Sequence, residues 1–216
     1  MDDSFIGGFM MTLVLTVFSL TLSFPIGVLM ALARTSTLPI FRLLSTAFIE
    51  VSRGVPLITV LFFFATVIPL FLPEGMSITE LAAAVVALIL FSSAYVAENI
   101  RGGLQSVLRG QFEAADAMGL TTAQRTSLIV LPQALRVSIP PLVGQAIATY
   151  KETSLIAIIG LFDFLLIAET IIPSQNVFRG NRFEPLLFVS LIYWIGAYSM
   201  SLYSRNLEKR LGVGTR

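Results

Sequence analysis

The sequence has neither cysteine nor histidine among its 216 residues. Without cysteine the chain has no disulfide bridge, no thiolate metal ligand and no thiol nucleophile. Without histidine it has no imidazole ligand or base and no Ser-His-Asp triad. These absences exclude many hydrolases and metalloenzymes, so we expect no catalytic residue and no metal site. They say nothing about the redox compartment.

Charged residues are also scarce. Asp, Glu, Lys and Arg make up 12% of the chain, whereas an average soluble domain has about 25%. Hydrophobic residues make up 56%, and the mean hydropathy is +0.86. So few charges cannot cover a water-soluble globule of this size, which indicates a protein embedded in lipid. The formal net charge of +1 argues against a nucleic acid partner.

Five stretches are long and apolar enough to cross a bilayer, which takes about 20 apolar residues. Four are runs without a charged residue, at 4–33, 54–73, 81–97 and 185–204. The fifth joins 137–150 to 153–162 across Lys151 and Glu152. We predict an all-α integral membrane protein with one transmembrane domain over 1–216. Its predicted spans cover about 5–33, 48–72, 79–101, 137–168 and 185–207.

The loops that follow the first, third and fifth predicted spans contain most of the basic residues. Arginine lies at 34 and 42, four times between 101 and 136, and again after residue 204. The opposite loops, around Glu74 and at 179–184, contain only two bases. Because Lys and Arg prefer the cytoplasmic side, we expect the N-terminus outside and the C-terminus in the cytoplasm.

The largest predicted piece outside the bilayer is the cytoplasmic loop at about 103–132. Good helix formers follow Gly110, acidic residues lie in the first turns at Glu113 and Asp116, and Gly119 is placed to end the helix in a left-handed conformation. We therefore expect a short helix that ends at Gly119.

A second short helix is expected directly after this corner. Thr121 and Gln124 have the spacing of a capping box, which predicts a helix over 122–130 that closes before Pro132. Two short helices with a tight corner make a compact knuckle under the membrane. The pattern alone fits an ordinary amphipathic connector equally well.

The letters of this loop resemble the EAA signature of permease subunits in bacterial ATP-binding cassette (ABC) importers. The matching letters are Glu113-Ala114-Ala115, Gly119, Ile129 and Leu131-Pro132. The resemblance implies a coupling helix that docks in a cleft of a separate ATPase subunit. The residues it assigns to this coupling are Glu113, Ala114, Ala115, Ala117 and Gly119.

Three further segments resemble polar amino acid permeases. They are an E-x-x-R-G-x-P pattern at 50–56, A-Y-x-A-E-x-x-R-G at 94–102 and K-E-T-S-L at 151–155, and 160–163 matches the general L-amino acid branch. The resemblance implies the type I ABC importer permease fold. Some members of that branch have additional N-terminal spans, so we expect either a shorter member or a sequence trimmed before Met1.

The chain has no ATP-binding motif of its own. A Walker A loop ends in Gly-Lys-Ser/Thr, and neither Lys151 nor Lys209 follows a glycine. We expect no enzyme activity and no cofactor in this chain, with ATP and Mg bound by the partner ATPase. The resemblance implies a second permease subunit, the same or similar, two ATPase subunits and an extracytoplasmic amino-acid-binding protein, in the lipid of a bacterial inner membrane.

Two pairs of charges lie near the predicted cytoplasmic ends of spans. Glu50 with Arg53 and Glu98 with Arg101 each have i,i+3 spacing, so each pair can neutralise itself on one helix face. Structural ion pairs and a role in gating or docking are both open for them.

Lys151 and Glu152 lie deeper. Fourteen residues separate Arg136 from Lys151, roughly 21 Å of helix, which is past the middle of the bilayer core. We expect a helix break there, with Thr153 or Ser154 capping a half-helix over 155–166. The free N–H groups of such a helix suit a carboxylate, and Glu152 suits an ammonium group.

We therefore place a substrate pathway for amino acids near these residues. Its candidate members are Tyr95, Glu98, Lys151, Glu152, Thr153 and Ser154. Structural pairing of Lys151 or Glu152 with another span is the alternative.

The function that we expect is the membrane subunit of an ATP-driven amino acid importer. An ATP-independent channel or carrier for small polar solutes is the alternative, and a membrane scaffold and an intramembrane enzyme are weaker ones. The importer pattern at Glu113–Gly119 disfavours all three.

Overall fold

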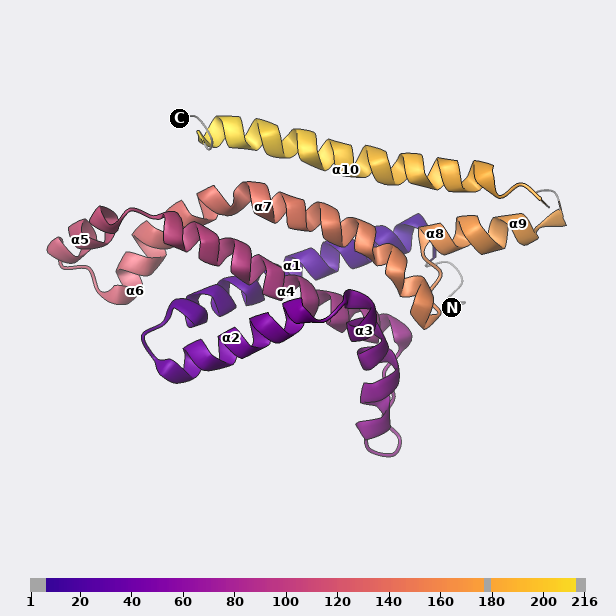
Figure 1. Cartoon of the computed structure of the whole chain (residues 1–216), viewed down its shortest axis with the longest axis horizontal. Coiled ribbons are helices and arrows are strands. Elements are labelled where there is room, and N and C mark those ends of the chain that lie inside the picture. Colours follow the sequence, from indigo (N-terminus) through magenta and orange to yellow (C-terminus); the bar gives the residue numbers. More distant parts are fainter. Residues whose placement is uncertain (1–6, 177–179, 213–216) are drawn as a thin grey trace.

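The computed structural model describes residues 7–176 and 180–212, and the helices dominate it (Figure 1). The longest helices are α1 (Phe9–Thr35), α4 (Glu80–Ser106), α7 (Leu131–Glu152) and α10 (Phe183–Leu211). No strand occurs in these ranges, where only an isolated bridge joins Gly8 to Asp163. The predicted all-α class is confirmed. Residues 5 and 6 of the first predicted span, and residue 179, lie outside the described ranges.

The centre of the fold is the packing of α1 and α7 on α4. Small residues of α4 are fully buried, among them Ala84, Ala87 and Ala97. A Cβ added to Gly103 would overlap the carbonyl oxygen of Ala134 in α7. In lipid, where apolar surface gains little from burial, close backbone approach through small residues is the main source of helix association.

The second predicted span is not one straight helix. The structure has α2 (Pro39–Gly54) and α3 (Leu57–Phe62), and the helix continues from α3 to Phe71 through π and 3-10 turns. The two parts meet at an angle of 106°. The cause is Pro56, which disfavours helical backbone at the residue before it, and Val55 is accordingly extended at φ −111°, ψ 135°.

The fourth predicted span begins earlier than expected and is continuous. One helix of 38 residues runs from Thr122 to Ile159, through α6 (Thr122–Gln124), a π-helical stretch Arg125–Val130 and α7. The predicted closure before Pro132 is therefore wrong. A proline ring normally collides with the carbonyl four residues earlier, and the wider π turn just before Leu131 gives that ring room.

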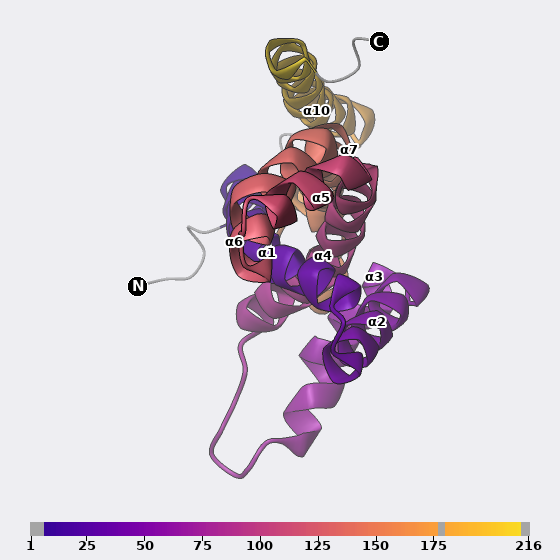
Figure 2. The same ribbon diagram turned by 90° about the vertical axis from the view of Figure 1, so that its left-hand side faces the viewer.

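Four helices are long and apolar enough to span a membrane, and the bent pair α2–α3 raises the number to as many as five. The start of α1 and the end of α10 lie at opposite ends of the bundle, and α5 and α6 lie at the same end as the end of α10 (Figure 1). Seen from that end, α10 and the α2–α3 pair lie on opposite sides of the central helices (Figure 2).

Candidate functional site

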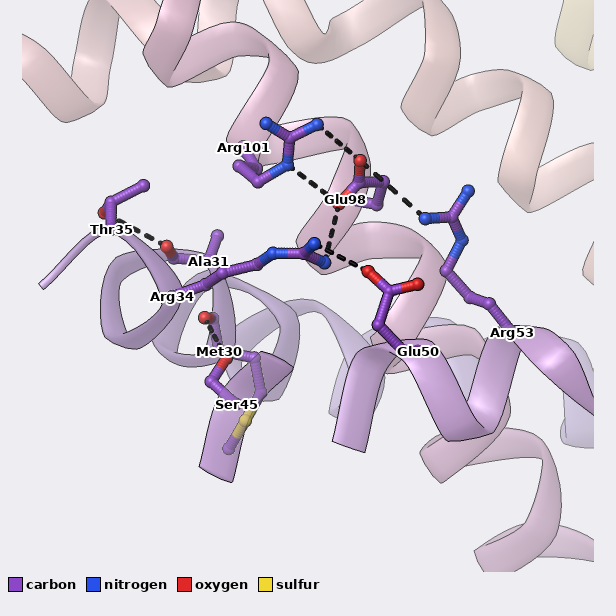
Figure 3. Close-up of polar contacts among 9 residues, drawn as sticks. All are labelled: Met30, Ala31, Arg34, Thr35, Ser45, Glu50, Arg53, Glu98 and Arg101. Atoms are coloured by element: carbon purple, nitrogen blue, oxygen red, sulfur yellow. Dashed lines mark hydrogen bonds and ion pairs between the residues drawn. The ribbon is translucent and has the colours of Figure 1, made fainter. Parts of the chain in front are cut away.

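The carboxylate of Glu98 in α4 is the centre of an ionic cluster (Figure 3). Arg101, one turn further along α4, donates to it from Nε at 2.9 Å and from Nη2 at 2.5 Å. Arg34 at the end of α1 donates from Nη1 at 3.2 Å. Arg53 of α2 approaches Glu98 Oε1 with Nη1 at 3.7 Å. One side chain thus connects α4 to the two helices α1 and α2, which come much earlier in the sequence.

Glu50 of α2 does not form the predicted pair with Arg53. Its partner is Arg34, whose Nη2 lies 2.6 Å from Glu50 Oε1. The reason is that α2 runs back along α1, so Arg34 lies between Glu50 and Glu98, whereas Arg53 reaches toward α4 (Figure 3). Glu98 and Arg101 do form their i,i+3 pair. The signal that sequence reasoning missed was Arg34, which we used only to orient the first span.

The ring of Tyr95, one helical turn before Glu98, contacts an arginine of this cluster. The guanidinium carbon of Arg53 lies 5.6 Å from the centre of the Tyr95 ring, within the range of a cation–π contact. The centre of the Phe91 ring, one turn earlier in α4, lies 5.0 Å from the centre of the Tyr95 ring. Tyr95 and Glu98, two predicted pathway residues, therefore lie in one place with the ionic cluster.

The predicted knuckle is present beyond the end of α4. Helix α5 (Arg109–Ala117) is followed by Gly119 at φ +76°, a left-handed conformation that glycine adopts without strain. Thr121 then forms both hydrogen bonds of a capping box with Gln124. Local sequence rules sufficed here because each feature depends on residues within one helical turn.

Within the knuckle, some side chains of α5 are buried and others are exposed to solvent. Ala115 is buried, whereas Ala114, Ala117 and Glu113 are exposed. Glu113 is 3.3 Å from Arg109, but both side chains are mostly in solvent, so this pair contributes little to stability. The exposed residues of α5 therefore include two small alanines and the acidic Glu113.

Asp116 has a partner within its own loop. Arg125 Nη1 lies 2.6 Å from both of its carboxylate oxygens, and the guanidinium also lies over the Phe112 ring at 5.6 Å. This pair fixes α5 against the first turns of the long helix. Its carboxylate is thus engaged by Arg125 within the same loop.

The chain does not break at Lys151 and Glu152, so the predicted half-helix over 155–166 is wrong. Thr153 has helical backbone angles, and the chain continues as a 3-10 helix, Thr153–Ile159. The hydroxyls of Thr153 and Ser154 do not cap a helix but donate to the carbonyls three residues earlier, Tyr150 O and Lys151 O, at 2.8 Å each.

The charges at this point lack partners in the described residues. Lys151 is exposed and forms no ion pair there, and Glu152 Oε2 is a buried oxygen without a hydrogen-bond donor. A buried hydrogen bond between Ser92 and Thr149, 3.1 Å, joins α4 to α7 next to them. The structure thus brings Lys151, Glu152, Thr153 and Ser154 together on one turn, apart from the ionic cluster.

A new helix begins further on, at Asp163, which sequence reasoning did not identify as a cap. Gly160 turns the chain at φ +89°, and the fully buried Asp163 then accepts from the backbone N–H groups of Leu165 and Leu166 at 2.9 Å. This begins α8 (Phe164–Leu166), which continues to Ser174 at the end of α9 (Ile172–Ser174). The sequence contained the signal, because Gly160 is followed by two apolar residues and then by an aspartate, which is a preferred N-cap residue.

The described residues contain no group of three or more side chains suited to hold a metal ion.

Comparison with known proteins matches residues 23–213 to the family described as Binding-protein-dependent transport system inner membrane component. The chain is 48% identical over 210 residues to the inner membrane amino-acid ABC transporter permease protein YhdY of Escherichia coli (strain K12), with 96% of the chain and 56% of that protein covered. It is 40% identical over 207 residues to the probable glutamine ABC transporter permease protein GlnP of Bacillus subtilis (strain 168), with 94% and 91% covered.

A solved structure is also similar. A chain of the crystal structure of an amino acid ABC transporter with histidines superposes with a TM-score of 0.83 at 35% identity, covering 94% of this chain and 92% of that one. In length, this chain spans about half of YhdY and of the permease protein BztC of Rhodobacter capsulatus, 56% and 48%.

Glu98→Gln should destabilise the fold more than Glu50→Gln. Glu98 is 20% exposed and faces three arginines, so its loss leaves their charges close together, at a cost of about 2 kcal/mol or more. Glu50 is 57% exposed and has one partner, so its loss should cost under about 1 kcal/mol. Thermal unfolding in detergent measures both, and equal melting temperatures for the two variants would contradict a central role for Glu98.

Proposed function

The chain belongs to the family of binding-protein-dependent transport system inner membrane components, and we propose that it forms half of the translocation pathway of an ATP-driven amino acid importer. The similarity to amino acid permeases over nearly the whole chain supports this proposal. It works with a second permease subunit, two ATPase subunits that bind ATP and Mg, and an extracytoplasmic amino-acid-binding protein. Its N-terminus lies outside and its C-terminus in the cytoplasm.

The observation that carries the proposal is the knuckle at α5. It presents a small exposed surface, Ala114 and Ala117, on which another helix or cleft can approach closely. Gly119 and the capping box of Thr121 hold that surface in a fixed orientation. A rigid, exposed knuckle at the end of a membrane bundle suits contact with a moving soluble subunit.

Force on the knuckle reaches the membrane through one continuous helix. The ion pair of Asp116 with Arg125 attaches α5 to the helix Thr122–Ile159, which is roughly 57 Å long at 1.5 Å per residue. Lys151 to Ser154 lie near its far end. Closure of the ATPases thus moves the turn with Lys151 and Glu152 as one piece with the knuckle.

The substrate contacts that turn through charge. Lys151 supplies a cation for the carboxylate that every α-amino acid carries, and the unpartnered Oε2 of Glu152 supplies an acceptor for the ammonium group. The hydroxyl groups of Thr153 and Ser154 donate their hydrogens to backbone carbonyls, so these two residues shape this turn more than they bind the substrate. The substrate then passes Tyr95 and Glu98, which lie further toward the cytoplasm.

Uptake measurements test the function directly. Proteoliposomes that contain the chain with its ATPase and binding-protein neighbours should accumulate glutamine or other polar amino acids only when ATP is present. Uptake by the chain alone, without ATP, would identify a passive channel or carrier instead. No solute movement with any partner would indicate a scaffold.

Gly119→Val should weaken binding of the ATPase subunits. A β-branched residue at φ +76° costs about 1–2 kcal/mol or shifts the corner after α5. The matched control is Gly75→Val, because Gly75 has φ +88° and equally open surroundings but lies in the loop between α3 and α4. Co-purification of the ATPase with each variant measures the effect. Equal recovery of the ATPase with both variants would exclude the coupling role of Gly119.

Glu152→Gln should lower uptake about tenfold or more, since a hydrogen bond to a charged group contributes about 1.5–3 kcal/mol. The substitution keeps the shape of the side chain and removes only its charge. Glu184→Gln, in the exposed first turn of α10, is the control. Should uptake and substrate-stimulated ATP hydrolysis remain at the control level, Glu152 has only a structural role.

A further inference from the structure

The ionic cluster around Glu98 has one more cation than it has anions. Its described ion pairs connect three arginines, Arg34, Arg53 and Arg101, to two glutamates, Glu50 and Glu98. We propose that the guanidinium of Arg53, held over the Tyr95 ring, is a binding site for an oxyanion, and that the oxyanion is the carboxylate of the transported amino acid after it has left Lys151 and reached Tyr95. This inference rests on the proposed import function.

The surplus charge belongs to Arg53 because the other two arginines hold the carboxylates more closely. Arg101 donates two hydrogen bonds to Glu98, and Arg34 donates one each to Glu98 and Glu50. Arg53 has no hydrogen bond to either carboxylate and only a long contact of 3.7 Å. Its side chain is also the most exposed of the three, at 36% against 20% for Arg34 and 24% for Arg101.

Arg53 is oriented for a ligand by its two contacts. Its Nη1 approaches Glu98, and its guanidinium carbon lies 5.6 Å from the centre of the Tyr95 ring. A guanidinium has five N–H donors along its edge, and a carboxylate accepts two of them in parallel. Within the described residues the Arg53 guanidinium donates no hydrogen bond, so its N–H groups are available to a carboxylate.

The location makes a counter-ion valuable there. The cluster lies near helix ends, since Arg34 is the last residue but one of α1 and Arg53 the last residue but one of α2. The Arg53 side chain is only 36% exposed, and an anion that pairs with it offsets the lost solvation of this partly shielded cation. Arg53 also lies next to the break at Val55, where α2 ends and α3 turns away.

The phosphate of an anionic lipid headgroup has the same chemistry as the substrate carboxylate. Equilibrium binding to the purified full chain in nanodiscs separates the two sources. The probes are radiolabelled L-glutamine and L-glutamate, with their α-methyl esters as competitors whose carboxylate is masked. Each measurement is made in phosphatidylcholine alone and in phosphatidylcholine with phosphatidylglycerol.

Arg53→Gln should weaken amino acid binding about tenfold in both lipids, and the methyl esters should compete poorly against the wild type. Arg53→Lys should recover part of the affinity, because it keeps the charge without the two-pronged geometry. Arg205→Gln, an exposed arginine on α10, is the control and should bind like the wild type. Arg53→Lys also covers the case in which Arg53→Gln fails to fold.

Two outcomes overturn the substrate assignment. If Arg53→Gln loses only phosphatidylglycerol that co-purifies with the wild type, the oxyanion is a lipid headgroup. If the wild type binds no amino acid, or if both Arg53 variants bind as the control does, the site does not exist. Nanodisc binding needs no ATPase, so failure of ATP-driven uptake would contradict the import function without affecting this result.

Discussion

The carboxylate of Glu98 is the interaction on which the end of the bundle nearest the knuckle depends. It is accessible to arginines from α1, α2 and α4 at once, so charge joins these helices beside the buried apolar cluster that Ala31, Ile49 and Ile100 help to form. Helix α2 buries only Ser45 and Ile49, and its other firm attachment is the hydrogen bond of Ser45 to Met30 O at 2.6 Å. Without Glu98, α2 would keep the buried Ile49, the hydrogen bond of Ser45 and the pair of Glu50 with Arg34, and would lose its charged contact with α4.

The same end of the molecule contains the connection between the knuckle and the long helix Thr122–Ile159. The knuckle joins the long helix through Asp116 and Arg125, and that helix reaches Lys151 without interruption. The ionic cluster holds α1, α2 and α4 together, and α7 packs on α4 through Gly103 and Ser138.

The sequence allowed the helix class, the knuckle with its left-handed Gly119 and the Glu98–Arg101 pair to be predicted, because each depends on composition or on residues within one turn. The partner of Glu50 could not be predicted, since Arg34 reaches it only through the packing of α1 on α2. The break was expected at Thr153, where charges lie at depth, and it occurs at Gly160, where glycine permits the turn and Asp163 caps the next helix. The effect of proline was mispredicted twice. Pro56 bends the second predicted span, which we expected to be one helix, whereas Pro132 lies inside a helix that we expected to end before it.

The π-helical stretch Arg125–Val130 has a consequence for how this chain tolerates changes in length. One residue added to a regular helix rotates everything beyond it by about 100° and shifts it by about 1.5 Å. Such an insertion between Leu131 and Lys151 would turn the charged residues away from the face that they now occupy. A π turn, however, is a turn with one residue more than a regular α turn, so the loss of a single residue can convert it to a regular turn in place. The stretch Arg125–Val130 is therefore a part of this long helix where a single deletion leaves both of its ends in register.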